Sequence, residues 1–307
     1  MEKHTDGMLP LFFGVTYDYG YSGKQDNIFI NDLKFAISYQ VTSRLGISAT
    51  LPFTKKVFSN ANFTGSLQGI GDILLSSNYV LFTKYPTTIG ATDYGPGWDP
   101  NNESSMFRSP KTTIDLDVGV KIPTALTNRN KLPLRYQAGM GTNDLLIGIS
   151  YIPGPKTTAG EFDPEFWKFG LDFQIPFGIA SNSIDSIRRG PDLVGRISYF
   201  NAIPNLDCQV ELLAIKRLTK TKEYFNGPFI VTSESSPDPI DTVYGSYEIP
   251  KSDFFQVNLR LSAKYYFAKN TGLLFGAAIP FIKRGENSDG TERSYTLFCG
   301  ISYLFGR

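Results

Sequence analysis

Apolar and polar residues alternate along most of this chain of 307 residues. Within residues 33–41 every second residue is apolar: Leu33, Phe35, Ile37, Tyr39 and Val41. Residues i, i+2 and i+4 of a β-strand share one face, so such a segment has one apolar face and one polar or small face. No segment shows a convincing helical period of 3.6 residues. The alternation therefore predicts an all-β protein.

Twelve segments carry this alternation. They span residues 11–20, 27–41, 45–53, 70–82, 112–122, 143–152, 166–177, 191–200, 206–217, 253–267, 271–281 and 293–305. Their connections are alternately short and long, as in antiparallel strands joined in sequence. The long ones lie near 54–69, 83–111, 123–142 and 218–252, and 83–111 departs from the order by falling on the short-turn side. We predict one 12-stranded antiparallel up-and-down β-barrel domain over residues 1–307.

An internal repeat supports this count of strands. The even-numbered segments share a pattern in which an Asp-like residue precedes Leu or Ile and stands seven positions before a Tyr: Asp32–Tyr39, Asp72–Tyr79, Asp144–Tyr151, Asp192–Tyr199, Asn258–Tyr265 and Thr296–Tyr303. Four odd-numbered segments end in Leu or Ile, Pro, and Phe or Thr, beginning at Leu51, Ile122, Ile175 and Ile279. The repeating unit is an antiparallel hairpin that is used six times.

The spacing of seven places aromatic residues at the edges of the apolar face. An odd offset puts the tyrosine on the face opposite the Asp-like residue, with the Leu or Ile. The tyrosines then lie close to the short turns: Tyr39, Tyr79, Tyr151, Tyr199, Tyr265 and Tyr303. Phe53, Phe177 and Phe281 lie at the other edge. Two aromatic edges around an apolar band are typical of the membrane girdles of a transmembrane barrel.

A soluble barrel would show the same alternation with its apolar face inward. The aromatic edges favour an outward apolar face, because a bilayer interface selects aromatic residues and a packed core does not. An even strand number puts both termini on the short-turn side, which is periplasmic in bacterial outer-membrane barrels. The last segment, Tyr295 to Phe305, resembles the terminal strand of those proteins. We therefore predict a barrel in the outer membrane of a Gram-negative bacterium.

The polar face then lines the lumen. The predicted pore-lining residues are Asp32, Lys34, Asp72, Asp115, Asp117, Lys121, Asp144, Lys168, Asp172, Asp192, Arg196, Glu211, Arg260 and Lys264. Of these, Asp32, Asp72, Asp144 and Asp192 are expected to form part of a carboxylate ring near the long connections. Such charges either tune the field that a solute meets or pair with one another and fill a closed interior.

Composition excludes several other functions. The balance of 30 Lys and Arg against 29 Asp and Glu gives no electrostatic footprint for nucleic acid. The only histidine is His4, so Ser-His-Asp triads and histidine-dependent metal sites lack their central residue. Cys208 and Cys299 show no metal-ligand spacing. We predict no enzyme, no cofactor and no metal site. Residues 1–7 lack the apolar region of a signal peptide, so we expect an exported chain to carry its signal peptide outside this sequence.

Short motifs between residues 45 and 200 resemble a known family. They are Leu51-Pro52-Phe53, Gly69-Ile70-Gly71-Asp72 before Tyr79, Gly119-Val120-Lys121-Ile122-Pro123-Thr124, and Gly139-Met140-Gly141-Thr142-Asn143-Asp144 before Tyr151. They resemble the outer-membrane transporter family associated with phenol-degradation pathways, except that Ala125 replaces the glycine that usually follows Pro-Thr. The resemblance implies passive transport of small molecules, aromatic or hydrophobic ones included, with outer-membrane lipid and the solute as partners.

One alternative remains open. A non-conducting structural or adhesive barrel would present its long connections to a partner, and residues 218–252 carry several carboxylates for such a surface.

Overall fold

The structure is a computed structural model that describes residues 11–22, 27–59, 64–84, 112–130, 132–153, 165–224, 229–233, 236–243, 245–268, 270–283 and 294–305. Apart from one turn of 3-10 helix, η1 (Leu134–Tyr136), its regular structure in these residues is β-strand. No helix within these ranges is long and apolar enough to cross a membrane.

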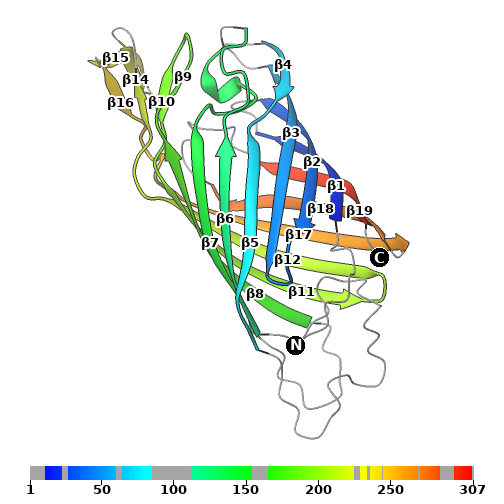
Figure 1. The fold of residues 1–307 in the computed structure, drawn as a ribbon. Helices are drawn as coiled ribbons and strands as arrows, with labels where there is room; N and C mark the ends of the chain where they lie inside the picture. Colours follow the sequence, from blue (N-terminus) through cyan, green and yellow to red (C-terminus); the bar gives the residue numbers. More distant parts are fainter. Residues whose placement is uncertain are drawn as a thin grey trace, which may run out of the picture.

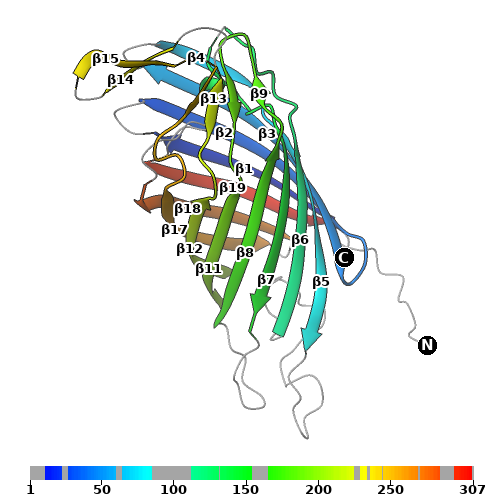
Figure 2. The same ribbon diagram turned by 90° about the vertical axis from the view of Figure 1, so that its left-hand side faces the viewer.

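Twelve strands form one closed antiparallel barrel, as predicted (Figures 1 and 2). They are β1 (Leu11–Tyr21), β2 (Ile28–Gln40), β3 (Leu45–Ser59), β5 (Ile73–Lys84), β6 (Thr112–Ile122), β7 (Asn143–Ile152), β8 (Glu165–Phe177), β11 (Asp192–Ile203), β12 (Leu206–Arg217), β17 (Phe255–Ala268), β18 (Thr271–Ile282) and β19 (Tyr295–Phe305). The first strand closes the barrel against the last, with Leu11 opposite Phe305 and Tyr21 opposite Tyr295.

Short turns occupy one end of the barrel. Between β2 and β3, Thr42 Oγ1 accepts hydrogen bonds from the backbone N–H groups of Arg44 and Leu45 at 3.2 and 3.0 Å. Between β11 and β12, Asn205 adopts a positive φ of 62°, which asparagine tolerates better than most residues. Because β1 begins and β19 ends at this end, residues 11 and 305 also lie there.

The opposite end contains strands within segments that the sequence indicated as loops. β3 continues to Ser59 and pairs with β4 (Thr64–Ile70) inside the expected loop 54–69. Residues 218–252 contain β13 (Lys222–Tyr224), β14 (Phe229–Ser233), β15 (Ser236–Val243) and β16 (Ser246–Glu248). β9 (Ala180–Ser181) and β10 (Ser186–Arg188) join β13 and β16 in a four-stranded sheet. Several of these strands have only two or three residues, and polar residues and glycine interrupt the apolar alternation of β4, so the sequence pattern did not reveal them. Most of segment 83–111 lies outside the described residues.

Large apolar side chains point away from the barrel axis. Phe35, Ile149 and Leu171 are 39%, 47% and 50% exposed in the isolated molecule, which is the arrangement of a barrel in contact with lipid. By contrast, the two clusters of buried apolar residues among the described residues lie at the long-connection end. The clustered apolar core of this protein therefore lies at one mouth of the barrel. The apolar side of the barrel wall itself faces outward.

Candidate functional site: the barrel lumen and its mouth

All fourteen residues that the sequence placed in the pore occupy inward positions of the barrel, where they alternate with exposed outward residues. Several form ion pairs across neighbouring strands. Arg196 on β11 lies 2.5 Å from Asp172 on β8, and Arg260 on β17 lies 3.9 Å from Glu211, its ladder partner on β12. The Arg196, Asp172 and Arg260 side chains remain 34%, 21% and 43% exposed, so these pairs face open space.

Two carboxylates on β6 have no such partner. Asn78 donates a hydrogen bond of 2.8 Å to Asp117, and the Ser150 hydroxyl lies 3.5 Å from Asp115. Within the described parts of the chain, no Lys or Arg nitrogen lies within 4.0 Å of either carboxylate. The inward face of β6 therefore presents negative charge to the lumen. Lys168, on β8, also faces the lumen.

The expected carboxylate ring is not a ring of free charges. Asp144 is fully buried and forms ion pairs with Arg189 and with Lys121, the latter at 2.7 Å. It also accepts hydrogen bonds from the Gln174 amide at 2.6 Å and from the Thr142 hydroxyl at 2.8 Å. Lys121 also lies 3.8 Å from Asp72. The positive charges neutralise both carboxylates, as in the second alternative, in which the inward charges pair with one another. The sequence could not show this, because Arg189 comes from the connection between β8 and β11.

A second buried pair lies beside the first. Arg217 is 2% exposed, and its Nε and Nη2 atoms donate to the two oxygens of Asp192 at 3.0 and 2.8 Å. Its Nη1 atom donates to Thr221, whose backbone N–H in turn donates to Ser252 at 2.9 Å. This bidentate pair fixes the start of the connection after β12 to the barrel wall. Asp32, the fourth expected ring member, is also buried, opposite Asp18 and Thr54 in the ladder.

Residues 123–142, between β6 and β7, form a packed segment across the mouth, which we call the mouth segment. Tyr136 is buried against Ile28, Ile30 and Phe58 on the inner face of the β2–β3 wall, and its ring centroid lies 5.4 Å from that of Phe58. Leu134, two residues earlier, is buried with Ala180 and Ile187 of β9 and β10. One turn of helix thus touches both sides of the mouth (Figure 1).

Polar contacts hold the mouth segment at several points. Asp72 accepts a hydrogen bond of 3.0 Å from the Met140 N–H, and Asp185 accepts one of 3.0 Å from the Leu134 N–H. Asn182 donates to the Leu132 carbonyl at 2.9 Å. A β-carbon at Gly139 would overlap the Asp72 carboxylate, so glycine is required there. The polar composition of the connection hides this segment in the sequence; the apolar residues Leu132, Leu134 and Tyr136 within it are the available signal.

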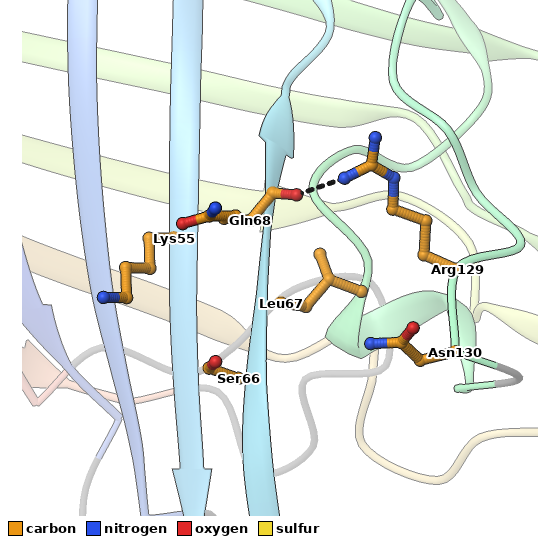
Figure 3. A pocket seen from close by; sticks show the side chains of 6 residues that line it. All are labelled: Lys55, Ser66, Leu67, Gln68, Arg129 and Asn130. Carbon is orange, nitrogen blue, oxygen red and sulfur yellow. Dashed lines mark hydrogen bonds between the residues drawn. The ribbon is translucent and has the colours of Figure 1, made fainter.

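A groove of about 500 Å³ lies at the rim, where the mouth segment meets β3 and β4. Figure 3 shows the side chains that line it. Lys55, Ser66, Leu67, Gln68, Arg129 and Asn130 line it, and Arg129 donates a hydrogen bond of 2.5 Å to the Gln68 carbonyl. Most of this lining is polar, unlike the predominantly apolar lining typical of small-molecule pockets. The groove is therefore a weaker candidate site than the lumen.

Eight of the nine expected girdle residues lie on the outer surface with 40–61% of their area exposed: Tyr39, Tyr79, Tyr151, Tyr265, Tyr303, Phe53, Phe177 and Phe281. Tyr199 is only partly exposed, because its ring packs against that of Trp167 at a centroid distance of 5.1 Å.

No family model matches the chain. No curated protein is similar to it in sequence at a significant level. Among solved structures, the COG4313 outer membrane channel from Pseudomonas putida F1 superposes with a TM-score of 0.62 at 13% identity, over 99% of this chain and 100% of that one. The chain has the fold of an outer-membrane β-barrel.

Two porins are more distant. The KdgM porin gives a TM-score of 0.44 at 10% identity, over 95% of this chain and 99% of its own. The NanC porin gives 0.43 at 7% identity, over 95% and 98%. Their similarity is too low to support an argument, and none of these three similarities concerns phenol degradation.

Proposed function

We propose that the protein is an outer-membrane channel for the passive movement of small solutes, with its short-turn end and both termini in the periplasm. One observation carries this proposal: five of the six neighbouring strands from β6 to β17, all except β7, hold charged side chains on their inward faces that remain partly exposed.

A dry interior would not tolerate this lining. An isolated charge in an apolar medium is strongly unfavourable, and an ion pair offsets that penalty only with good geometry and further hydrogen bonds. Among the described residues no Lys or Arg forms an ion pair within 4.0 Å of Asp115 or Asp117, although Lys168 interacts with Asp115 at longer range, and Arg260 keeps 43% of its side chain exposed. Barrels of about eight strands fill with side chains, whereas 16-stranded barrels leave an aqueous channel, so twelve strands allow a narrow one.

Nine of the fourteen proposed pore-lining residues fall into two contrasting groups. Asp72, Lys121, Asp144 and Asp192 belong to the buried network at the mouth, where the charges are compensated. Asp115, Asp117, Lys168, Arg260 and Lys264 lie deeper in the barrel and set the field that a permeating solute meets.

The family resemblance adds the solute class: aromatic or hydrophobic small molecules. Aromatic rings on the lumen face support this extension. Phe166 and Phe200 stack with centroids 4.6 Å apart and ring planes 8° apart, and Phe12 and Tyr266 lie on the inward faces of β1 and β17.

Conductance in planar bilayers and solute flux in liposome-swelling assays test the channel. We expect discrete steps of ionic current from the purified, refolded barrel and swelling with small sugars or amino acids. Absence of both from correctly folded protein, including a variant with the mouth segment released by Tyr136→Ala, would refute the proposal.

A second candidate function has its own supporting observation. The four-stranded sheet of β9, β10, β13 and β16 and the β14–β15 hairpin build a structured surface at the long-connection end (Figure 2). A non-conducting adhesive barrel would use this surface to bind a partner. Deleting residues 229–243 would abolish adhesion of such a protein but would leave the conductance of a channel measurable.

A further inference from the structure

One wall of the lumen differs from the rest. On β18 and β19 the inward residues are small or apolar with few polar groups and no charge: Gly272, Leu274, Gly276, Ala278, Thr296, Phe298, Gly300, Ser302 and Leu304. β17 borders this wall on one side and β1 on the other. Two cationic side chains of β17, Lys264 and Arg260, lie over it. We call the four strands β17, β18, β19 and β1 together the cation wall.

Lys264 crosses the cation wall from β17. Its Nζ atom lies 4.8 Å from the centroid of the Tyr266 ring and 5.4 Å from that of Phe12, which comes from β1. A β-carbon at Gly272 would lie 2.7 Å from Lys264 Cε, so the glycine lets the lysine stem lie flat. Asp207, its ladder partner, interacts electrostatically with the ammonium, but no carboxylate oxygen of the described chain forms an ion pair with it within 4.0 Å.

Arg260 repeats this arrangement four residues earlier on β17, roughly 13 Å along the strand. Its guanidinium carbon lies 4.7 Å from the centroid of Phe298, and the Phe298 ring lies over Gly276, where a β-carbon would overlap it. Glu211 is 3.9 Å away, and much of the Arg260 side chain remains exposed. The wall thus presents two cations at two levels, each supported by aromatic rings.

We propose that the cation wall is a binding site for organic anions, which are small molecules with a carboxylate on a flat, apolar body. A ring beneath a cation stabilises its charge without occupying its hydrogen-bond donors in the way a carboxylate does. The free donors of Lys264 pair with the ligand carboxylate, and Phe12 and Leu304 contact its body. Transport through the proposed channel would bring the anion to the wall; binding itself does not require transport.

Equilibrium dialysis with the barrel in lipid nanodiscs tests the site, with empty nanodiscs as blank. Three probes separate the contributions: benzoate, benzyl alcohol with the same body but no charge, and acetate with the charge but no body. We expect benzoate to bind about tenfold more tightly than either, because both parts of the site contribute. Equal affinity for benzoate and benzyl alcohol would overturn the proposal.

Lysine variants locate the site. Lys264→Gln is expected to weaken benzoate binding about tenfold and Lys264→Arg by less than about threefold, because arginine keeps the charge over the rings. Lys168→Gln removes the same charge from β8, away from the wall, and is expected to weaken benzoate binding by less than about twofold, through the field of the lumen alone. Equal losses from Lys264→Gln and Lys168→Gln would mean a diffuse attraction and would overturn the site. Gel mobility before and after heating checks that each variant is folded.

Bilayer recordings on the same preparations keep the two proposals separate. A barrel that conducts chloride but does not bind benzoate overturns the anion site and leaves the channel. A barrel that binds benzoate but shows neither ionic current nor liposome swelling, with Tyr136→Ala included, upholds the site and refutes the channel.

Discussion

The buried network at the mouth and the cation wall use charged residues in opposite ways. At the mouth, Asp144 and Arg217 are 0% and 2% exposed, and each has oppositely charged partners. On the cation wall, Lys264 and Arg260 lie over aromatic rings and stay accessible. A buried charge is stable only when its partners are complete, so the mouth network serves structure, whereas accessible cations keep their charge available to a solute.

The largest expected effect comes from breaking the mouth network. Asp144→Asn leaves Lys121 and Arg189 without their shared carboxylate in a buried setting, which should lower the free energy of unfolding by about 3–5 kcal/mol. Urea titration of the barrel folded in vesicles measures this loss. Asp172→Asn is the matched control, because its pair with Arg196 is partly exposed, and it should cost less than about 1 kcal/mol. Similar losses of unfolding free energy from both variants would contradict the proposed difference between the buried network and the partly exposed pair.

Tyr136→Ala should release the mouth segment. Truncating this buried ring removes its packing against Ile28, Ile30 and Phe58, a local loss of about 3 kcal/mol. We expect a larger single-channel conductance with little change in the stability of the barrel strands. Leu126→Ala, on the same segment but 61% exposed, is the control and should conduct like the parent protein. Unchanged conductance in Tyr136→Ala would show that the segment does not restrict the lumen.

The carboxylates of β6 should have a smaller, purely electrostatic effect. Asp115→Asn combined with Asp117→Asn removes two negative charges that have no close ion-pair partner, which should raise the anion-to-cation permeability ratio about two- to fivefold. Reversal potentials in a salt gradient report this ratio. The double variant Asp172→Asn, Arg196→Gln removes an ion pair without changing net charge and should leave the ratio close to that of the parent. A larger change in the permeability ratio for this control than for the β6 double variant would contradict the proposal that Asp115 and Asp117 set the ion selectivity.

The smallest expected change concerns stability at the cation wall. Lys264→Gln should alter the free energy of unfolding by less than about 1 kcal/mol, since a partly exposed cation–π contact contributes only about 0.5–1 kcal/mol. Arg217→Gln, which breaks a buried bidentate pair, should cost about 3 kcal/mol or more in the same urea titration. A destabilisation by Lys264→Gln as large as that by Arg217→Gln would make Lys264 a structural residue.

The sequence predicts the barrel strands well because alternation is a local property of each strand. The expected bounds 112–122 and 206–217 coincide with β6 and β12. Local pattern fails where order depends on distant partners. β3 continues past Phe53 because β4 supplies a hydrogen-bonding neighbour, and Leu134 is ordered because Ala180 and Ile187 cover it.

The same limit applies to the site. The spacing of seven identifies Asp144 and Asp192 as inward residues, but it cannot show that Arg189 and Arg217 neutralise them. Phe12 and Lys264 are 252 positions apart in the sequence and come together only through the curvature of four strands. No periodicity within one strand encodes that contact.

The contact between Phe12 and Lys264 depends on the pairing of β1 with β19 that closes the barrel. Phe12 belongs to the first strand of the barrel and Lys264 to the tenth, so they meet only after the last strand has paired with the first. Until then the chain is an open sheet with two free edges, and Phe12, one of the two aromatic partners of the lysine, is missing. Ligand retention would therefore report a sealed barrel, and an anion present during assembly would favour the sealed state over every partly joined intermediate.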